Sequence, residues 1–185
     1  MILGVESESV LTDHIVCRRV DGAQIAEIQR LRYRVWKNEG VALYDEGSGV
    51  IADQHDNHAF HWGVFDDENL VGAARLCIHD RQSDVPDTQL FASLALPIPV
   101  ASMNRLVVLR EYRGFGIGRA LDERRVETAR NMGACAIVLA PVDRDFRLAQ
   151  IQELGFTLLP GASVPTLWSP SVRARACYRL LDGSR

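Results

Sequence analysis

The chain has 185 residues, of which 47% are hydrophobic and 24% charged, and its formal net charge is −3. This composition predicts one globular domain over residues 1–185 and excludes a fibrous, disordered or membrane-embedded protein. Because a net negative charge attracts neither nucleic acid nor an anionic membrane surface, neither is expected as a partner.

The N-terminus and the cysteines predict the cellular compartment. The chain turns acidic at Glu6 and Glu8 before a signal-like apolar segment can form, and no uninterrupted apolar run approaches about 18 residues. The four cysteines are widely spaced and form no C-x-x-C pair, which is typical of thiols in a reducing compartment. We therefore expect a cytoplasmic protein.

The beginning of the chain predicts a short strand followed by an amphipathic helix. Residues 14–20 carry strand-forming side chains, and Asp21 and Gln24 have the spacing of a capping box that begins a helix. The helix is expected to end near Gly40. Its core-facing residues recur at steps of three and four: Ile25, Ile28, Leu31, Val35 and Trp36.

Two irregular segments flank a predicted β-hairpin. Residues 41–58 are rich in Gly, Asp and Asn and are expected to form a functional loop with at most a short helix. Residues 59–65 and 70–79 are strand-like on either side of the polar turn 66–69, which favours antiparallel pairing. A second irregular segment covers residues 80–101.

The second half of the chain predicts alternating strands and helices. The expected order is a strand at 102–109, a helix at 118–132, a strand at 135–140, a helix at about 145–154 and a strand from Phe156. The first three of these elements form a βαβ unit. The first helix is expected to have an apolar face made of Ile117, Leu121, Val126, Ala129 and Met132. Much of its solvent-exposed face is expected to consist of Asp122, Glu123, Arg124 and Arg125.

A glycine-rich turn joins the strand at 102–109 to the helix that follows it. Gly114, Gly116 and Gly118 alternate with Phe115 and Ile117. Glycine permits positive φ, so successive backbone N–H groups can face a concave turn, and the helix N-terminus adds further unpaired N–H groups. The turn therefore predicts a diphosphate site in which the side chains of Phe115 and Ile117 are free to vary. A tight turn without a ligand also favours glycine.

The spacing of these glycines excludes two common phosphate-binding motifs. A dinucleotide-binding turn needs G-x-G-x-x-G, but counting from either of the first two glycines places Arg119 or Leu121 at the last position. A P-loop needs G-x-x-x-x-G-K followed by Ser or Thr, and no register of the chain provides it. The motif that matches is R-x-x-G-x-G, at Arg113, Gly116 and Gly118.

In this setting the chain resembles the GNAT family of N-acetyltransferases. The resemblance covers the order of predicted elements over residues 14–159. It is strengthened by Arg105-Leu106-Val107-Val108 before the motif and by Glu153-Leu154-Gly155-Phe156 after it. It implies an α/β (α+β) GNAT fold, with a mixed, mostly antiparallel central sheet flanked by helices on both faces.

A closer resemblance is to a bacterial branch typified by ElaA-like proteins, whose first helix contains L-R-x-x-V-F-x-x-E. The matching residues here are Leu31, Arg32, Val35, Trp36 and Glu39, with Trp in place of Phe. The match continues with Asp53, Asp56, Ala59, His61 and Val71-Gly72-Ala73-Ala74-Arg75-Leu76. The helix motif is also similar to that of the acyl-homoserine-lactone and N-acyl-amino-acid synthases, which take long acyl chains from acyl carrier protein.

The resemblance implies acetyl-CoA as the cosubstrate and no metal. It implies that the backbone of Leu106, Val107 and Val108 binds the pantetheine arm. The diphosphate is implied to lie on the segment that begins the motif at Arg113 and continues through Gly114, Phe115, Gly116, Ile117, Gly118 and Arg119.

The catalytic positions of the family are matched less well. Many members place a Tyr four residues before the glycine of the last helix, where it protonates the leaving thiolate, and here this residue is Ile151. The strand before the glycine turn often supplies a carboxylate base, but here it offers Ser102 and Asn104, which can only position a water. We expect Asn104 in that role and Glu39 as an alternative base, although a solvated acid at a helix end also explains Glu39. The sequence does not rank the hydroxyls of Tyr33, Tyr44 and Tyr178.

Ligand-capable side chains gather in residues 53–61, namely Asp53, His55, Asp56, His58 and His61. We expect no metal there, because the segment is predicted to be a loop entering a strand, on which these side chains do not share a face. The resemblance instead gives Asp53, Asp56 and His61 a structural or acceptor-binding role. An acceptor carboxylate is expected to bind an arginine, with Arg32 or Arg75 preferred over Arg34 and Arg105.

Three functions therefore remain open. The first is an N-acetyltransferase that moves an acetyl group from acetyl-CoA to a primary amine of a small molecule or peptide by direct attack. The second is an N-acyltransferase that takes a longer acyl chain from acyl carrier protein. The third is a CoA-binding module without turnover, which the missing Tyr and carboxylate keep open. The sequence determines neither the acceptor nor the oligomeric state, and a homodimer remains an expectation.

Overall fold

The computed structural model describes residues 9–11, 14–41, 47–161, 163–166 and 169–181. The helices are α1 (Ala23–Asn38), α2 (Ile117–Asn131) and α3 (Asp145–Glu153). The strands of the main sheet are β1 (Ser9–Val10), β2 (Ile15–Val20), β3 (Phe60–Asp66), β4 (Asn69–His79), β5 (Val100–Val108), β6 (Ala136–Leu139), β7 (Thr157–Leu158) and β10 (Cys177–Leu180). Short 3-10 helices are η1 (Gln54–His58), η2 (Gln82–Asp84), η3 (Thr88–Phe91) and η4 (Arg110–Tyr112).

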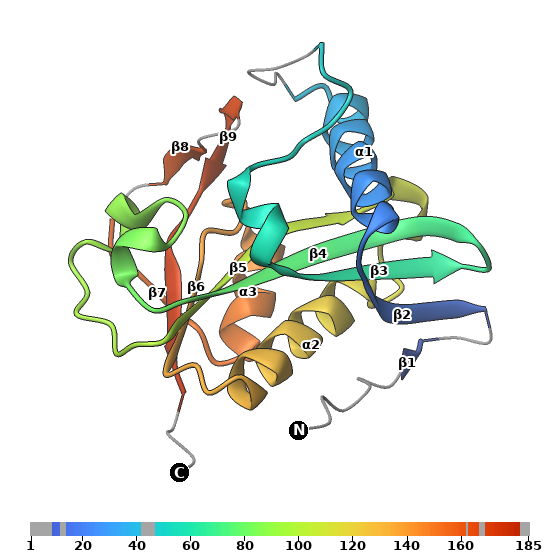
Figure 1. Cartoon of the computed structure of the whole chain (residues 1–185). Helices are drawn as coiled ribbons and strands as arrows, with labels where there is room; N and C mark the ends of the chain where they lie inside the picture. The colour runs from blue at the N-terminus through green and yellow to red at the C-terminus, as the bar shows by residue number, and fades with distance from the viewer. Residues whose placement is uncertain (1–8, 12–13, 42–46, 162, 167–168, 182–185) are drawn as a thin grey trace.

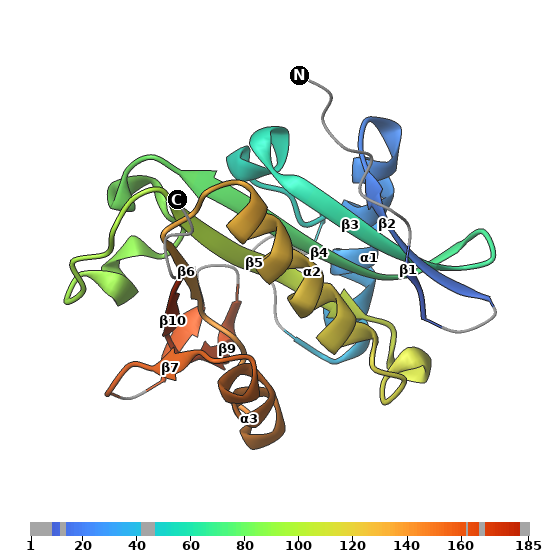
Figure 2. The same cartoon turned by 90° about the horizontal axis from the view of Figure 1, so that it is seen from below.

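Within the described residues the main sheet has eight strands in the order β1-β2-β3-β4-β5-β6-β10-β7. Strands β5 and β6 run parallel, and the other neighbours are antiparallel. Helix α1 covers one face of the sheet, and α2 and α3 cover the other (Figure 1 and Figure 2). These observations confirm the predicted fold class, including the βαβ unit formed by β5, α2 and β6.

The predicted hairpin and the end of the first helix are also confirmed. Strands β3 and β4 pair from Phe60 with Leu76 to Asp66 with Asn69, and the turn between them places Asp67 at positive φ. Helix α1 ends at Asn38, and Gly40 follows with a φ of 68°. Polar turn residues and a terminal glycine are local signals, so they locate these boundaries within a few residues.

The predicted capping box at the start of α1 is wrong. Gly22 occupies the N-cap with a φ of 52°, and no side chain caps the helix. Gln24 instead accepts a hydrogen bond from Arg18 at 3.1 Å through its side-chain oxygen. A capping box does form at η1, where the Asp53 side chain accepts from the backbone of the first turn and Asp56 accepts from the backbone N–H of Asp53.

The C-terminal segment contains strands that the sequence patterns did not predict. A separate hairpin, β8 (Val164–Thr166) and β9 (Ser169–Ala174), stands apart from the main sheet (Figure 1). Strand β10 then enters the sheet between β6 and β7. Strands β8 and β9 are short, contain Pro165 and Pro170, and pair with each other, so no alternating pattern marks them in the sequence. Strand β10 is also short, and its pairing with β6 depends on a segment far away in the sequence.

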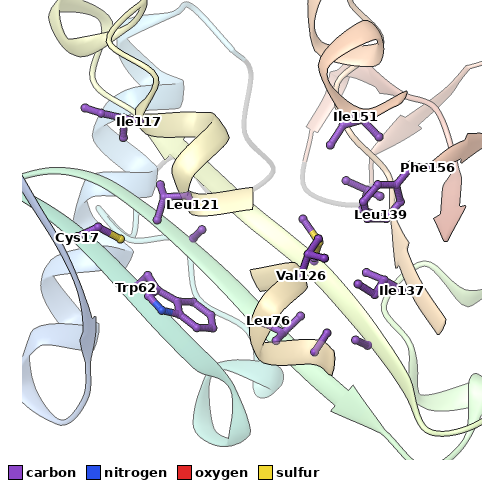
Figure 3. Close-up of a cluster of buried hydrophobic side chains, with 14 of the residues drawn as sticks. Cys17, Trp62, Leu76, Ile117, Leu121, Val126, Ile137, Leu139, Ile151 and Phe156 are labelled. Atoms are coloured by element: carbon purple, nitrogen blue, oxygen red, sulfur yellow. The ribbon is translucent and has the colours of Figure 1, made fainter. Parts of the chain in front are cut away.

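The core has one apolar layer on each face of the sheet. On the α1 face, Ile28, Leu31 and Val35 of the helix pack with buried sheet residues that include Phe65 and Val107. On the other face, the larger cluster joins the sheet to α2 and α3, and its labelled members in Figure 3 include Trp62, Leu121 and Ile151. Two opposed apolar layers hold the sheet between the helices.

The expected solvent-exposed face of α2 is partly buried. The side chains of Asp122 and Arg125 are fully enclosed, and Asp122 forms ion pairs with Arg125 and with Arg147 of α3. Arg125 also donates to the backbone oxygens of Asn104 at 3.2 Å and Arg75 at 3.3 Å. Burial lowers the pKa of Arg125 to about 10, although Asp122 opposes the shift.

The hydrogen bonds of Arg125 lie at an irregularity in the sheet. Between the pairs Arg75 with Asn104 and Ala73 with Val107, one residue of β4 faces two residues of β5. This is a β-bulge, and its extra residue, Arg105, has a φ of 55°. The guanidinium of Arg125 satisfies carbonyl oxygens that the interrupted pairing leaves beside the bulge.

We expect Arg125→Met to lower the free energy of unfolding by about 3–5 kcal/mol, because it leaves a buried carboxylate and buried carbonyls with fewer donors. Urea unfolding followed by circular dichroism measures this change. Arg124→Met, which removes a partly exposed pair with Glu127, is the control and should cost under about 1 kcal/mol. An equal loss in the two variants would contradict the structural role of Arg125.

Candidate functional site

The sheet opens between β5 and β6. The two strands pair only from Val100 with Ala136 to Ser102 with Val138, although β5 continues to Val108. Beyond Ser102, β6 keeps its pairing with β10 on its other side. The edge of β5 that faced β6 is therefore available for a ligand that binds like an added strand.

The glycine turn follows β5 and η4 and leads directly into α2. Gly114 and Gly116 have φ values of 88° and 79°, and Gly116 is the N-cap of α2 without a side-chain cap. In the described part of the chain, the N–H groups of Gly114, Phe115 and Gly116 donate to no acceptor. A Cβ atom at Gly114 or Gly116 would meet nothing within 4 Å. The open concave turn and its unpaired donors fit a diphosphate.

The two residues between the glycines behave differently from each other. Phe115 is 63% exposed, whereas Ile117 is 1% exposed and belongs to the core cluster. The ideal Cβ position of Gly72 lies 3.2 Å from a methyl group of Ile117. The expectation that Ile117 is free to vary is therefore wrong, because its side chain anchors the start of α2 on the sheet.

Arg113 and Arg119 flank the turn with exposed charges. Arg113 donates to the backbone oxygen of Val108 at 3.0 and 3.1 Å and forms an ion pair with Glu39. Arg119 pairs with Glu123 and Glu153. Glu39 thus lies at the end of α1 beside the glycine turn, which places the predicted alternative base near the diphosphate end of the site.

One cavity of about 1490 Å³ connects the glycine turn to the opposite end of the β5–β6 opening. Its wall at the turn includes Gly116 and Gly118, and its wall along β5 includes residues 102–108. At the far end it is lined by polar groups from two loop segments and two strands, namely Asp53, His55, Arg75, Asp87, Asn104 and Arg105. The cavity therefore joins an anion-binding end to a polar end through the space between two strands.

A network of charged residues lies below the polar end, between η1 and the sheet. Arg32 and Arg75 both donate to Asp56, at 2.9 and 2.7 Å. Arg75 also donates to Asp53 at 2.6 Å, and Arg105 donates to Asp53 at 2.7 Å. We call these five residues the charged cluster.

Hydrogen bonds keep the carboxylates of the charged cluster ionised. Burial alone would raise the pKa of Asp53, but hydrogen bonds from Arg75 and Arg105 outweigh it and hold the pKa well below its usual range. The pKa of Asp56 is lowered in the same way, because Arg32 and Arg75 outweigh the effect of burial. Burial lowers the pKa of Arg32 to about 10 despite its pairing with Asp56.

His61 packs against the charged cluster in its neutral form. Its Nε2 lies 3.0 Å from the backbone oxygen of Asp56, which can only accept a hydrogen bond. Its Nδ1 lies 3.4 Å from Nη2 of Arg32, which can only donate. The proton therefore resides on Nε2, and burial, with the neighbouring arginines, lowers the pKa of the ring.

The predicted acceptor residues Arg32, Arg75 and His61 come together, but in the interior. The side chains of Arg32 and Arg75 are 1% exposed and form ion pairs with the carboxylates of the charged cluster. His61 is equally buried. Of the cluster's arginines only Arg105 is appreciably exposed, at 18%. The structure thus gives the buried residues a supporting place beneath the polar end of the cavity.

The predicted catalytic residue Asn104 ends a hydrogen-bonded row that the sequence did not predict. Ser102 Oγ donates to Oδ1 of Asn104 at 3.1 Å, and His79 Nε2 lies 2.8 Å from Ser102 Oγ. Because the Ser102 proton is used on Asn104, His79 Nε2 is the donor to Ser102. The Asn104 amide therefore presents its N–H groups rather than its oxygen to the cavity.

The position of the family's usual acid is part of the core. Ile151 is fully buried, and Figure 3 shows it beside Leu139 and Phe156. Among the described tyrosines, Tyr112 alone lines the cavity, and its hydroxyl donates to Asp66 at 2.7 Å. Tyr44 lies outside the described residues. A tyrosine acid at the expected place is therefore absent from the described part of the chain.

The described residues contain no group of three or more His, Cys, Asp or Glu side chains placed to hold a metal ion. None of the helices among them has the length and apolar character needed to cross a membrane.

The parallel strands β5 and β6 separate beside an open glycine turn, and this geometry fits a ligand that binds through a diphosphate and pairs with the free edge of β5. The family model for the acetyltransferase (GNAT) family matches residues 23–156, which is most of the chain. The chain therefore belongs to the GNAT acetyltransferase family and is an acetyl-CoA-dependent acyltransferase. The match is to the family as a whole and does not separate out the ElaA-like branch.

Solved structures share the fold at low sequence identity. The putative acetyltransferase yncA from Salmonella typhimurium, solved with acetyl-CoA, is 17% identical with a TM-score of 0.63, over 92% of this chain and 96% of that one. Arabidopsis thaliana NAA60, in complex with a bisubstrate analogue, is 14% identical with a TM-score of 0.66, over 92% and 99%. FeeM, an N-acyl amino acid synthase from uncultured soil microbes, is 17% identical with a TM-score of 0.65, over 92% and 91%. A search of curated protein sequences gave no match.

We expect Gly118→Leu to raise the Kd for CoA at least tenfold without a comparable loss of stability. Gly118 lines the cavity, needs no positive φ, and has only Leu106 within 4 Å of its ideal Cβ position, at 3.9 Å. A leucine there fills the proposed diphosphate site and removes charge-assisted hydrogen bonds. Calorimetric titration with CoA measures the effect, with Arg130→Leu at the far end of α2 as control. An unchanged Kd in a folded Gly118→Leu protein would contradict the assignment.

We expect His79 to make the protein less stable in mild acid. Burial, and next the neighbouring His55, lower the pKa of His79 to about 4. Between about pH 6.5 and 4 the unfolded state therefore binds a proton that the folded state excludes, so the free energy of unfolding falls as the pH falls. The full loss is on the order of 3 kcal/mol.

Urea unfolding at pH 7 and pH 4.5 tests this expectation. His79→Gln, which keeps a donor toward Ser102, should show a smaller loss between the two pH values than the wild type. His58→Gln, at an exposed position, is the control and should follow the wild type. The same pH dependence in all three proteins would exclude the contribution of His79.

Proposed function

We propose that the protein is an N-acetyltransferase that moves an acetyl group from acetyl-CoA to a primary amine by direct attack. The observation that supports this most strongly is the continuous cavity that joins the glycine turn to the polar end at Asn104 and Arg105. Acetyl-CoA supplies the acetyl group as a thioester, which is activated toward nucleophiles. The acceptor is a small molecule or a peptide with a free amine.

The backbone at one end of the cavity would hold the coenzyme. The N–H groups of residues 114–119 and the positive end of the α2 dipole would bind the diphosphate. The open edge of β5 at residues 106–108 would pair with the amide groups of the pantetheine arm, as an added strand does. The bound thioester would then lie between β5 and β6, where the acceptor can reach it from the polar end.

Direct attack is supported by the side chains of the cavity wall. Of the described residues that line the cavity, none is a cysteine. The serines of this wall are Ser102 and Ser171. The Ser102 proton is donated to Asn104, and His79 donates to Ser102 rather than accepting from it. The Ser171 hydroxyl is hydrogen-bonded to that of Ser169, which is not a base. A serine without a hydrogen-bonded base is a poor nucleophile. The described wall of the cavity therefore offers no activated serine or cysteine for an acetyl-enzyme intermediate.

The two predicted catalytic residues take different parts in this proposal. Asn104 lies on β5 at the polar end, where its N–H groups can orient the acceptor or the carbonyl group of the thioester. Glu39 lies at the other end, where it holds Arg113 beside the glycine turn. We therefore assign Asn104 a positioning role at the reacting groups and Glu39 a role in arranging the coenzyme end.

A cytoplasmic setting is part of the proposal. Cys77, Cys135 and Cys177 form no disulfide, which agrees with a reducing compartment. Burial raises the pKa of the Cys177 thiol to about 12, so this thiol stays protonated and unreactive at neutral pH.

A donor panel tests the reaction type. We expect thiol release from acetyl-CoA in the presence of mixed amines, with initial-rate lines that intersect as both substrates are varied. Release only from long acyl chains on acyl carrier protein would replace this proposal with the second function. Tight CoA binding without release from any donor would replace it with the non-catalytic one, and parallel lines would contradict direct attack.

A further inference from the structure

Two residues that line the cavity have a backbone conformation that is costly for their type. Among the described residues, three that are not glycine have positive φ: Asp67, Asp87 and Arg105. Asp67 belongs to the turn of the β3–β4 hairpin. Asp87 and Arg105, at φ values of 57° and 55°, come from different segments and both line the polar end of the cavity. Such strain is found preferentially at functional sites.

The guanidinium of Arg105 has donors left over. The β-bulge turns this side chain toward the cavity, where Nη2 donates to Asp53 at 2.7 Å. Nη1 and Nε donate to no described residue. The buried Nε atoms of Arg32 and Arg75 also have no partner, but those of Arg105 are not buried. Arg105 can therefore offer two further N–H directions to a ligand in the cavity.

The charged cluster also has one positive charge in excess. It contains three arginines and two aspartates, and His61 beside it is neutral. Arg32 pairs with Asp56 and Arg75 pairs with both carboxylates, and each of these arginines is 1% exposed, whereas Arg105 is 18% exposed at the cavity. The excess charge is consequently presented to the cavity at Arg105, where it attracts an anion.

Asp87 presents the opposite charge without a partner. It precedes η3, and its backbone oxygen accepts from Leu90 at 2.8 Å, but its side chain does not cap the helix as an aspartate there usually does. No described residue donates to its carboxylate. Burial raises its pKa, and the charges that act on it are those of Arg105 and Asp53. Arg105 and Asp87 thus influence each other across the cavity without forming an ion pair.

We propose that Arg105 and Asp87 together bind an acceptor that carries a carboxylate near its primary amine, such as a free amino acid. The inference rests on the proposed N-acetyltransferase function and names its substrate class. Arg105 binds the carboxylate in two-point geometry, and Asp87 binds the ammonium group. A zwitterion provides an anion for the remaining Arg105 donors and a cation for Asp87 at once. A simple amine or a peptide N-terminus leaves those remaining Arg105 donors without an acceptor.

Asn104 adds a third contact to this subsite. It precedes Arg105 on β5. Its side-chain oxygen accepts a hydrogen bond from Ser102, which accepts one from His79. Its N–H groups therefore face the cavity beside the guanidinium, where they can donate to the same carboxylate. A donor amide next to an arginine favours an anionic group over an ammonium group.

The proposed subsite also accounts for the protons of the transfer. The bound ammonium gives one proton to Asp87, which passes it to solvent. The neutral amine attacks the thioester carbon, the new N–C bond forms, and the C–S bond breaks. The second amine proton ends on the released thiolate, so the products are the N-acetyl compound and CoA thiol. A carboxylate whose pKa is raised by burial is a better proton acceptor than an exposed one.

Acceptor competition tests the proposed class. Purified protein with acetyl-CoA is assayed by thiol release with α-amino acids and β-alanine, each compared with its amide and with the amine that lacks the carboxylate. We expect kcat/KM for the free acids to exceed that for the amides at least tenfold, mainly through KM. Calorimetric binding of the preferred acid to the CoA-bound protein should show the same preference without turnover.

Two substitutions locate the preference. Asn tolerates positive φ, so Arg105→Asn and Asp87→Asn remove the charges while preserving the backbone. Arg105→Asn should lower kcat/KM for the acids about tenfold to a hundredfold and change that for the amides less than threefold. Asp87→Asn should lower kcat/KM for both. Asp84→Asn, exposed on the same loop, is the matched control and should behave as the wild type.

The outcomes separate the two proposals. Turnover of amides and simple amines with no preference for the acids would overturn the zwitterionic acceptor and leave the N-acetyltransferase function standing. Turnover of no amine at all would overturn both. Arg105→Asn also removes the pair with Asp53, so CoA affinity and melting temperature are measured alongside. Asp87 has no partner to lose, and a folded Asp87→Asn protein with wild-type kinetics would overturn the assignment on its own.

Discussion

The β-bulge at Arg105 is the constraint on which the rest of the site depends. One residue of β4 faces two of β5 at this point, so the ladder is interrupted in the middle of the sheet, where unpaired carbonyls are costly. Arg125 reaches through from α2 to satisfy those carbonyls. Its own buried charge then requires Asp122, which in turn pairs with Arg147 of α3. A single extra residue thus links the site, α2 and α3.

The glycine turn at the proposed coenzyme end was predictable because its sequence signals are local. The spacing of Arg113, Gly116 and Gly118 excluded other phosphate-binding turns, and the structure places those residues at the open turn before α2. The elements of βαβ type were likewise predictable from periodicity. The helical periodicity correctly placed Ile117 on the apolar face of α2. Its alternation with glycine suggested a side chain that is free to vary, and that expectation was wrong because Ile117 packs in the core.

The polar end was not predictable, because it is assembled from segments far apart in the sequence. Asp122 and Arg125 have the helical spacing of a surface ion pair. The sequence around them does not reveal that the bulge in β5 requires their side chains to be buried. Asp87 lies in a segment without periodicity, and its positive φ has no sequence signal comparable to glycine. The row from His79 through Ser102 to Asn104 joins two strands whose register only the folded sheet defines. The residues near His61 that the sequence pointed to do lie together, but their burial was not predicted.

The charged cluster links the folding of the polar end to its charge. The carboxylates that neutralise the buried arginines also hold η1 over the sheet. Removing Arg32 or Arg75 would leave buried charge without a partner, which costs several kcal/mol in typical cases. The first effect of losing either arginine is therefore a loss of folding stability rather than of ligand binding. Arg105 is the member whose charge is shared between the cluster and the cavity. An anion bound there interacts with a fixed array of charges rather than with one mobile side chain, so less ordering is needed on binding. The proposed coenzyme end relies on backbone donors and does not depend on the charged cluster, so under this proposal acceptor preference can change without loss of the coenzyme site.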